Sequence, residues 1–119
     1  MGYSISLVDP VSGEMLQTGE KHRIQGANYA IGGTRDMWVS VTYNYSPFFY
    51  KHIDQEKGIR FLYGKTGAET IPVLEDAISS LKDDATNRYW DATEGNAKRA
   101  LCGLLAFARM RPDGVWEGD

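Results

Sequence analysis

The chain has 119 residues, of which 42% are hydrophobic and 24% charged, and its net charge is −3. These values are close to those of soluble globular proteins and exclude a collagen or a coiled coil, and the length predicts one domain over residues 1–119. The longest apolar stretch, residues 104–108, is much shorter than the roughly 20 residues that span a bilayer, which excludes a membrane protein.

The N-terminal residues have the alternating pattern of a strand. Residues 3–8 alternate polar and apolar side chains and place Ile5 and Leu7 on one face. Residues 9–13 contain proline and glycine and predict a turn, because proline fixes φ and glycine adopts conformations that other residues avoid. A second short strand is predicted over residues 15–17.

The strongest strand pattern of the chain comes next. Residues 23–33 are punctuated by glycine and predict irregular structure with a short strand over residues 29–31. Residues 36–43 are rich in β-branched and aromatic side chains, which favour strands. A helix is then predicted to about residue 55, with Ser46 as its cap and Pro47 at its first position. Residues 59–63 are predicted as a strand or an extended connection.

Two longer helices are predicted in the C-terminal half. Thr66 and Glu69 match a capping box, and apolar residues then recur at helical spacing as far as Leu81. Pro72 disfavours a regular turn before it, so this helix is expected to start nearer residue 70. A last helix runs from its cap Thr93 to about residue 110, with an apolar stripe of Ala97, Ala100, Leu101, Leu104, Leu105 and Ala108.

Strands therefore come first along the chain and helices follow. This order predicts an α+β fold, in which a small antiparallel sheet from the N-terminal half packs against two or three helices from the C-terminal half.

The negative charge is confined to one end of the chain. Residues 1–112 hold 13 acidic and 13 basic residues, so the whole deficit comes from Asp113, Glu117 and Asp119. The chain therefore has no broad basic surface for a long nucleic acid, although a local basic pocket for a phosphate remains compatible with it. We expect the acidic tail either to pair with Arg109 or Arg111, or to offer a small acidic patch to a partner.

Other residue types exclude further classes of chemistry. The single cysteine, Cys102, lies in an apolar helical run and is predicted to pack as a small hydrophobic residue. His22 and His52 are 30 residues apart and have no ligand spacing around them, so neither a metal nor another cofactor is predicted. The first residues lack the pattern of a signal peptide, which predicts the cytoplasm of the cell in which the protein acts.

The sequence around Lys65 partly matches a phosphate-binding loop. Gly64, Lys65 and Thr66 precede a predicted helix, but the loop requires glycine at position 59, which is isoleucine here. The simpler interpretation is a tight turn in which Thr66 caps the helix.

An aromatic cluster is the strongest candidate for a binding site. Residues 43–50 contain five of the fourteen aromatic residues of the chain, at the junction of a strand and a helix. Tyr43, Asn44 and Tyr45 would form a ring-binding platform with a directed hydrogen bond. The alternative is that these aromatic side chains belong to the core, which is the stronger interpretation for Phe48 and Phe49.

A second candidate cluster is polar. Asn96 lies in the first turn of the last helix, where free N–H groups favour an anion, and Arg99 follows three residues later. Arg60 and Lys65 would add positive charge from the preceding connection. The alternative for Arg99 is a surface ion pair.

Several short blocks occur together in a known family. In them the chain resembles, from about residue 3 to its end, a small uncharacterised protein family of bacteriophages, prophages and bacterial mobile elements. The blocks are Gly32-Gly33-Thr34, Trp38, Thr42-Tyr43-Asn44-Tyr45-Ser46, Gly58-Ile59-Arg60, Tyr63-Gly64-Lys65-Thr66, Ile71-Pro72, Leu74-Glu75, Tyr89-Trp90, Asn96-Ala97 and residues 111–119. The resemblance implies a phage context and supplies no catalytic residues.

The leading hypothesis is therefore a non-enzymatic phage accessory protein that counters host immune defence. It would bind a host defence protein or sequester a small nucleotide signal in the cytoplasm of the bacterial host. The alternatives are a small enzyme that acts on a nucleotide or a sugar, and a virion or assembly component. A homo-oligomer is compatible with each of them.

Overall fold

The computed structural model describes residues 2–22, 33–88 and 90–119. Its main sheet has three antiparallel strands in the order β4-β1-β5, formed by β1 (Gly2–Val8), β4 (Trp38–Thr42) and β5 (Val115–Gly118). A separate antiparallel ribbon pairs β2 (Gln17–His22) with β3 (Thr34–Asp36). The antiparallel sheet that was predicted is thus present, with one strand contributed by the C-terminus.

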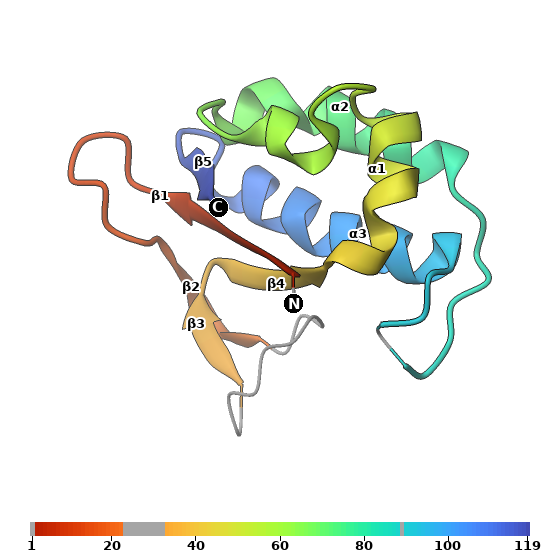
Figure 1. Cartoon of the computed structure of the whole chain (residues 1–119). Helices are drawn as coiled ribbons and strands as arrows, with labels where there is room; N and C mark the ends of the chain where they lie inside the picture. Colours follow the sequence, from red (N-terminus) through yellow and green to blue (C-terminus); the bar gives the residue numbers. More distant parts are fainter. Residues whose placement is uncertain (1, 23–32, 89) are drawn as a thin grey trace.

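Helices cover one face of this sheet. A 3₁₀ turn, η1 (Tyr43–Tyr45), leads from β4 into α1 (Ser46–His52), and a second 3₁₀ helix, η2 (Gly58–Leu62), follows. The two long helices are α2 (Gly67–Ser80) and α3 (Glu94–Met110), and α3 lies between α2 and the sheet (Figure 1). The fold is α+β, as the order of the elements predicted.

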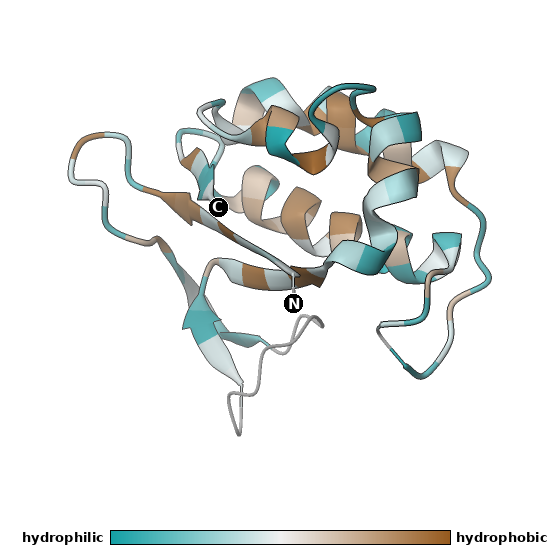
Figure 2. Cartoon of the chain, viewed as in Figure 1, coloured by the Kyte–Doolittle hydropathy of each residue, from teal (hydrophilic) through white to brown (hydrophobic). Residues whose placement is uncertain are grey.

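The core lies between the sheet and the helices. Tyr3, Ile5 and Leu7 of β1 are buried there, whereas Ser4 and Ser6 face outward, which is the alternation expected of a strand covered on one face. Figure 2 shows the hydrophobic residues gathered on the inner faces of α2, α3, β1 and β4, and the β2–β3 ribbon as largely hydrophilic. The predicted stripe of α3 is confirmed, because all six of its residues are buried.

The predicted strand over residues 36–43 is divided in the structure. Met37 separates β3 from β4, and its side chain is 1% exposed. The division follows from pairing, because β3 pairs with β2 whereas β4 pairs with β1. The strand predicted at residues 15–17 is also wrong: Leu16 bridges Leu7 and Met37 by backbone hydrogen bonds, and β2 begins only at residue 17. The predicted strand at residues 29–31 lies outside the described residues.

The connections around α1 also differ from the prediction. Ser46 is the first helical residue and does not cap the helix, because its hydroxyl is 2.6 Å from the Tyr3 hydroxyl. The helix ends at residue 52 and not at 55, since the Asp54 carboxylate accepts the N–H groups of Glu56 and Lys57 and starts a new turn. Residues 59–63 are mostly 3₁₀ helix and not a strand.

The capping box of α2 is confirmed. The Thr66 hydroxyl accepts the Glu69 N–H at 3.1 Å, and the Glu69 carboxylate accepts the Thr66 N–H at 3.0 Å. These hydrogen bonds hold the pKa of Glu69 below its usual value. The predicted later start of the helix is wrong, because the cap completes a first turn at Gly67 and the exposed Pro72 is accommodated within the helix.

The acidic tail folds as β5, which was not predicted. The Asp113 carboxylate forms an ion pair with Arg111 at 2.9 Å, one of the two pairings expected of the tail. Trp116 is 1% exposed, and its indole N–H donates to the Thr70 hydroxyl at 2.7 Å. The C-terminal strand is therefore attached both to β1 and to α2.

Among the described residues, none of the helices has the length and apolar character needed to cross a bilayer.

Candidate functional site

The aromatic cluster is divided between the surface and the core. Tyr45 is 3% exposed, and its ring centroid lies 6.2 Å from that of the fully buried Phe49, so both belong to the core. The prediction of Tyr45 as part of a surface platform therefore does not fit its position. Tyr43 is 40% exposed, and Asn44 is also exposed. Of the three residues predicted to form the platform, these two lie at the surface.

Tyr3 brings two of the predicted residues together. Its ring centroid is 4.7 Å from that of Tyr43, in an edge-to-face arrangement, and the Arg60 guanidinium lies 5.0 Å from the Tyr3 centroid. The pairing of β1 with β4 places Tyr3 at the end of β4, opposite Val41. Tyr3 is 40 residues from Tyr43 in the sequence, and only this pairing shows that the two belong to one site.

Arg60 is hydrogen-bonded to Asp119 of the C-terminal segment. Its Nε donates to the Asp119 carbonyl at 2.9 Å, and the Asp119 carboxylate accepts the N–H of Ser4 at 2.9 Å. The Arg60 side chain is thus already engaged within the fold, which makes this end of the site a poorer anion receptor than the sequence predicted.

Tyr63 lies in the same region. Its hydroxyl is buried and has no hydrogen-bond partner among the described residues. Burial, reinforced by the nearby Asp119, raises the pKa of Tyr63 to about 12. The phenol therefore stays protonated at any physiological pH.

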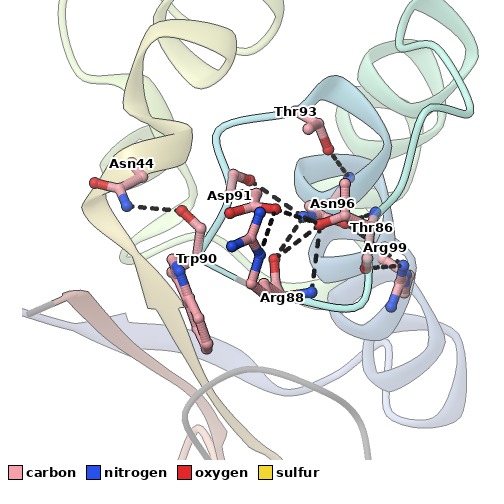
Figure 3. Close-up of polar contacts among 8 residues, drawn as sticks. All are labelled: Asn44, Thr86, Arg88, Trp90, Asp91, Thr93, Asn96 and Arg99. Atoms are coloured by element: carbon pink, nitrogen blue, oxygen red, sulfur yellow. Dashed lines mark hydrogen bonds and ion pairs between the residues drawn. The ribbon is translucent and has the colours of Figure 1, made fainter.

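Trp90 completes the exposed surface. The Asn44 side-chain amide donates to the Trp90 carbonyl at 2.7 Å, and the Trp90 side chain is 52% exposed. Figure 3 shows that the Asn44 carbonyl oxygen points away from Trp90. Among the described residues this oxygen accepts no hydrogen bond. Asn44 thus presents an acceptor that points away from Trp90, and it follows the exposed Tyr43 in the chain. We call Tyr43, Asn44 and Trp90 the Tyr43–Trp90 surface.

Trp90 was not identified as a site residue from the sequence. The only available signal was a large aromatic residue within the polar residues 82–96, where a core position is not expected.

Asn96 is an internal support and not an anion receptor. It is 3% exposed, and its carboxamide oxygen accepts the Thr86 N–H at 2.8 Å. Its amide nitrogen donates to the Thr86 hydroxyl and to the carbonyls of Arg88 and Asp91, at 3.0, 2.9 and 3.2 Å. The side chain is thus fully engaged by the loop that precedes α3.

The start of α3 already holds an anion that the chain itself supplies. The Asp84 carboxylate accepts the Gly95 N–H at 2.8 Å, and the Thr93 hydroxyl accepts the Asn96 N–H at 3.1 Å. These groups are the acceptors that a helix N-terminus favours. The sequence correctly indicated an anion-binding position, but the anion is intramolecular.

The remaining predicted cations also serve the fold. Arg99 donates to the Thr86 carbonyl at 3.0 Å and so supports the same loop as Asn96. Lys65 donates to the Phe61 carbonyl at 3.0 Å, and its ammonium lies 4.0 Å from the Phe61 ring centroid. No described contact joins Lys65 to the Tyr43–Trp90 surface.

Two hollows lie elsewhere on the molecule. A hollow of about 480 Å³ on the outer face of the sheet is lined by Ser4, Ser6 and Glu117, among others. One of about 260 Å³ lies beside α3 at Lys98, Arg99 and Cys102. Cys102 is exposed, contrary to the prediction, because it lies outside the buried stripe of α3. Within the described part of the chain no group of three potential His, Cys, Asp or Glu metal ligands is found.

Comparison of the chain with known protein families, with curated proteins and with solved structures found no match in any of the three.

Proposed function

We propose that this chain is a phage accessory protein that counters host defence by binding a host defence protein, and that the Tyr43–Trp90 surface makes the contact. One observation carries the proposal: the exposed residues Tyr43 and Asn44, at the end of β4, are joined through the Asn44–Trp90 hydrogen bond to a third exposed residue, Trp90, in the loop before α3. Tyrosine and tryptophan are enriched among the residues that dominate protein–protein binding energy.

The exposure of its two aromatic side chains supports a protein partner. Tyr43 and Trp90 are 40% and 52% exposed. Small ligands are usually held in concave sites that enclose most of their surface, whereas a protein partner can cover an open one. The phage context of the proposal comes from the family resemblance, and it implies that the partner is met in the cytoplasm of the host.

The test is restoration of phage growth. Bacteria that carry single defence systems are infected with and without expression of the chain, and plaques are counted. We expect the chain to restore plaque formation against one system, and to bind a purified component of that system. Tyr43→Ala and Trp90→Ala should each weaken this binding about fivefold or more, because truncating a residue that dominates an interface removes over about 1 kcal/mol of binding energy.

Tyr50→Ala is the matched control. Tyr50 is also a tyrosine, it is 37% exposed, and it lies on α1 outside the proposed surface. Binding that is unaffected by Tyr43→Ala and Trp90→Ala, or that Tyr50→Ala weakens equally, would contradict the proposed surface.

A nucleotide signal is the second candidate ligand. The exposed Tyr43 ring could stack on a base, and the Asn44 oxygen, which accepts no hydrogen bond from the described residues, could accept one from the base. Thermal unfolding with a panel of cyclic and ADP-ribose-derived nucleotides separates the candidates, because a ligand of the folded state raises the melting temperature. A rise that Tyr43→Ala abolishes would favour the nucleotide over the protein partner.

A further inference from the structure

The loop between α2 and α3 carries Trp90 to the surface, and one buried residue joins most of this loop to α3. We infer that Asn96 is a positioning residue that fixes Trp90 in the Tyr43–Trp90 surface without touching any partner. That Asn96 fixes Trp90 follows from the hydrogen bonds of the loop, whereas the effect of Asn96 on binding rests on the proposed function.

Asn96 contacts the loop on both sides of Trp90. Its amide nitrogen donates to the carbonyls of Arg88 and Asp91, and its oxygen accepts the Thr86 N–H. Thr86 adds a further connection, since its hydroxyl donates to the Asp91 carboxylate at 2.8 Å (Figure 3). A single carboxamide therefore holds the backbone at Arg88, two residues before the tryptophan, and at Asp91, one residue after it.

The rest of the loop is held closely against the same helix. A Cβ atom on Gly95 would lie 2.2 Å from the backbone nitrogen of Ala85, so only glycine permits this approach. The Asp84 carboxylate accepts the Gly95 N–H, and Arg99 donates to the Thr86 carbonyl. The loop is thus packed onto the start of α3 over most of its length.

Asn44 holds the same loop from the side of the sheet. Its bond to the Trp90 carbonyl joins the end of β4 to the loop that Asn96 holds. The spacing between Tyr43 and Trp90 is then set by two elements that are far apart in the sequence. Such preorganisation favours binding, because less conformational freedom is lost when the partner is bound.

The experiment measures the side-chain N–H signals of the full chain by NMR in Asn96→Asp. Aspartate has nearly the same shape but replaces the donating amide by an oxygen, which faces the carbonyls of Arg88 and Asp91. We expect the Trp90 indole and Asn44 amide signals to shift toward unfolded positions, while the Trp116 indole signal is unchanged. Trp116 is the internal reference, because its N–H is bonded to Thr70 in the core.

Two further variants make the result decisive. Asn87→Ala, in the same loop at an exposed residue, should leave all three signals unchanged. If Asn96→Asp also shifts the Trp116 signal, the chain has unfolded. The same three signals are then measured in Thr86→Val, in which the Trp90 and Asn44 signals should shift and the Trp116 signal should not. Trp90 and Asn44 signals that remain in place in the folded variant would overturn the inference.

Binding by the same variant separates the inference from the proposed function. If the Tyr43–Trp90 surface binds the defence protein as proposed, Asn96→Asp weakens this binding about as much as Trp90→Ala does. If the NMR signals shift as expected while both variants keep full binding, Asn96 still positions Trp90 but the proposed surface is wrong.

Discussion

Tyr63 shows how one polar atom is enclosed at the end of β5. A Cβ atom on Gly118 would lie 2.4 Å from Cζ of the Tyr63 ring, so the ring packs directly on the strand at a position that requires glycine. The hydroxyl has no partner among the described residues, whereas the Tyr3 hydroxyl contacts that of Ser46. The two phenols therefore differ in what they contribute to stability.

The first prediction concerns Tyr63→Phe. At neutral pH we expect the free energy of unfolding to stay within about 1 kcal/mol of the original or to rise, because an unbonded buried hydroxyl is removed. Tyr3→Phe is the control and should lower the free energy of unfolding by roughly 1 kcal/mol, since it leaves the Ser46 hydroxyl without this partner. Urea unfolding measures both, and a larger loss in Tyr63→Phe than in Tyr3→Phe would show that the Tyr63 hydroxyl has a partner.

The second prediction is a dependence on pH. A tyrosine ionises near pH 10 in an unfolded chain, whereas the pKa of Tyr63 is raised to about 12 in the fold. The stability linked to the neutral phenol is complete below pH 10 and is lost as the pH rises toward 12. Between pH 10 and 12 the unfolding free energy should therefore fall less steeply in Tyr63→Phe than in the original chain. Equal slopes would contradict a raised pKa.

Asn96 marks the limit of prediction from residue type. Its position in the first turn of α3 was predicted correctly, and so was the preference of that turn for an anion. That the anion is Asp84 and that the carboxamide binds Thr86 depend on how residues 82–93 fold back onto the helix. No local pattern carries that information, because each partner is 10 or more residues away along the chain.

At the scale of elements, the caps of the two long helices were predicted from local signals, whereas the pairing between strands was not. Thr66 and Thr93 cap α2 and α3 as predicted, because a cap depends on neighbouring residues only. β5 is a short acidic segment with little alternation, and it becomes a strand because β1 offers an edge for it more than 100 residues away in the sequence. The division of residues 36–43 into two strands likewise follows from their different partners.

The third prediction tests the cap of α2. Thr66→Ala removes the acceptor of the Glu69 N–H and should lower the free energy of unfolding by roughly 1 kcal/mol. Ser79→Ala, at the other end of the same helix, removes an exposed hydroxyl that bonds only the Asp76 carbonyl, and should have little effect. Equal effects of the two substitutions in urea unfolding would contradict a special role of the cap.

At the scale of the molecule, one buried hydrogen bond joins the two layers of the fold. The indole N–H of Trp116, on the sheet, donates to the hydroxyl of Thr70, on α2, and both residues are at most 1% exposed. The Thr70 hydroxyl in turn donates to the Gly67 carbonyl at 2.9 Å in the first turn of the helix. The C-terminal strand is thereby attached to the start of α2 as well as to β1.

The last prediction is that this bond couples the two layers. Thr70→Val keeps the shape of the side chain but leaves the buried indole N–H without an acceptor, which should lower the free energy of unfolding by about 1–3 kcal/mol. Trp116→Phe should also destabilise the fold, through lost packing volume. In the double variant no indole N–H remains to be left unsatisfied, so its loss should be smaller than the sum of the two single losses by more than about 0.5 kcal/mol. Strict additivity of the three urea-unfolding measurements would mean that this side-chain hydrogen bond does not couple the sheet to α2.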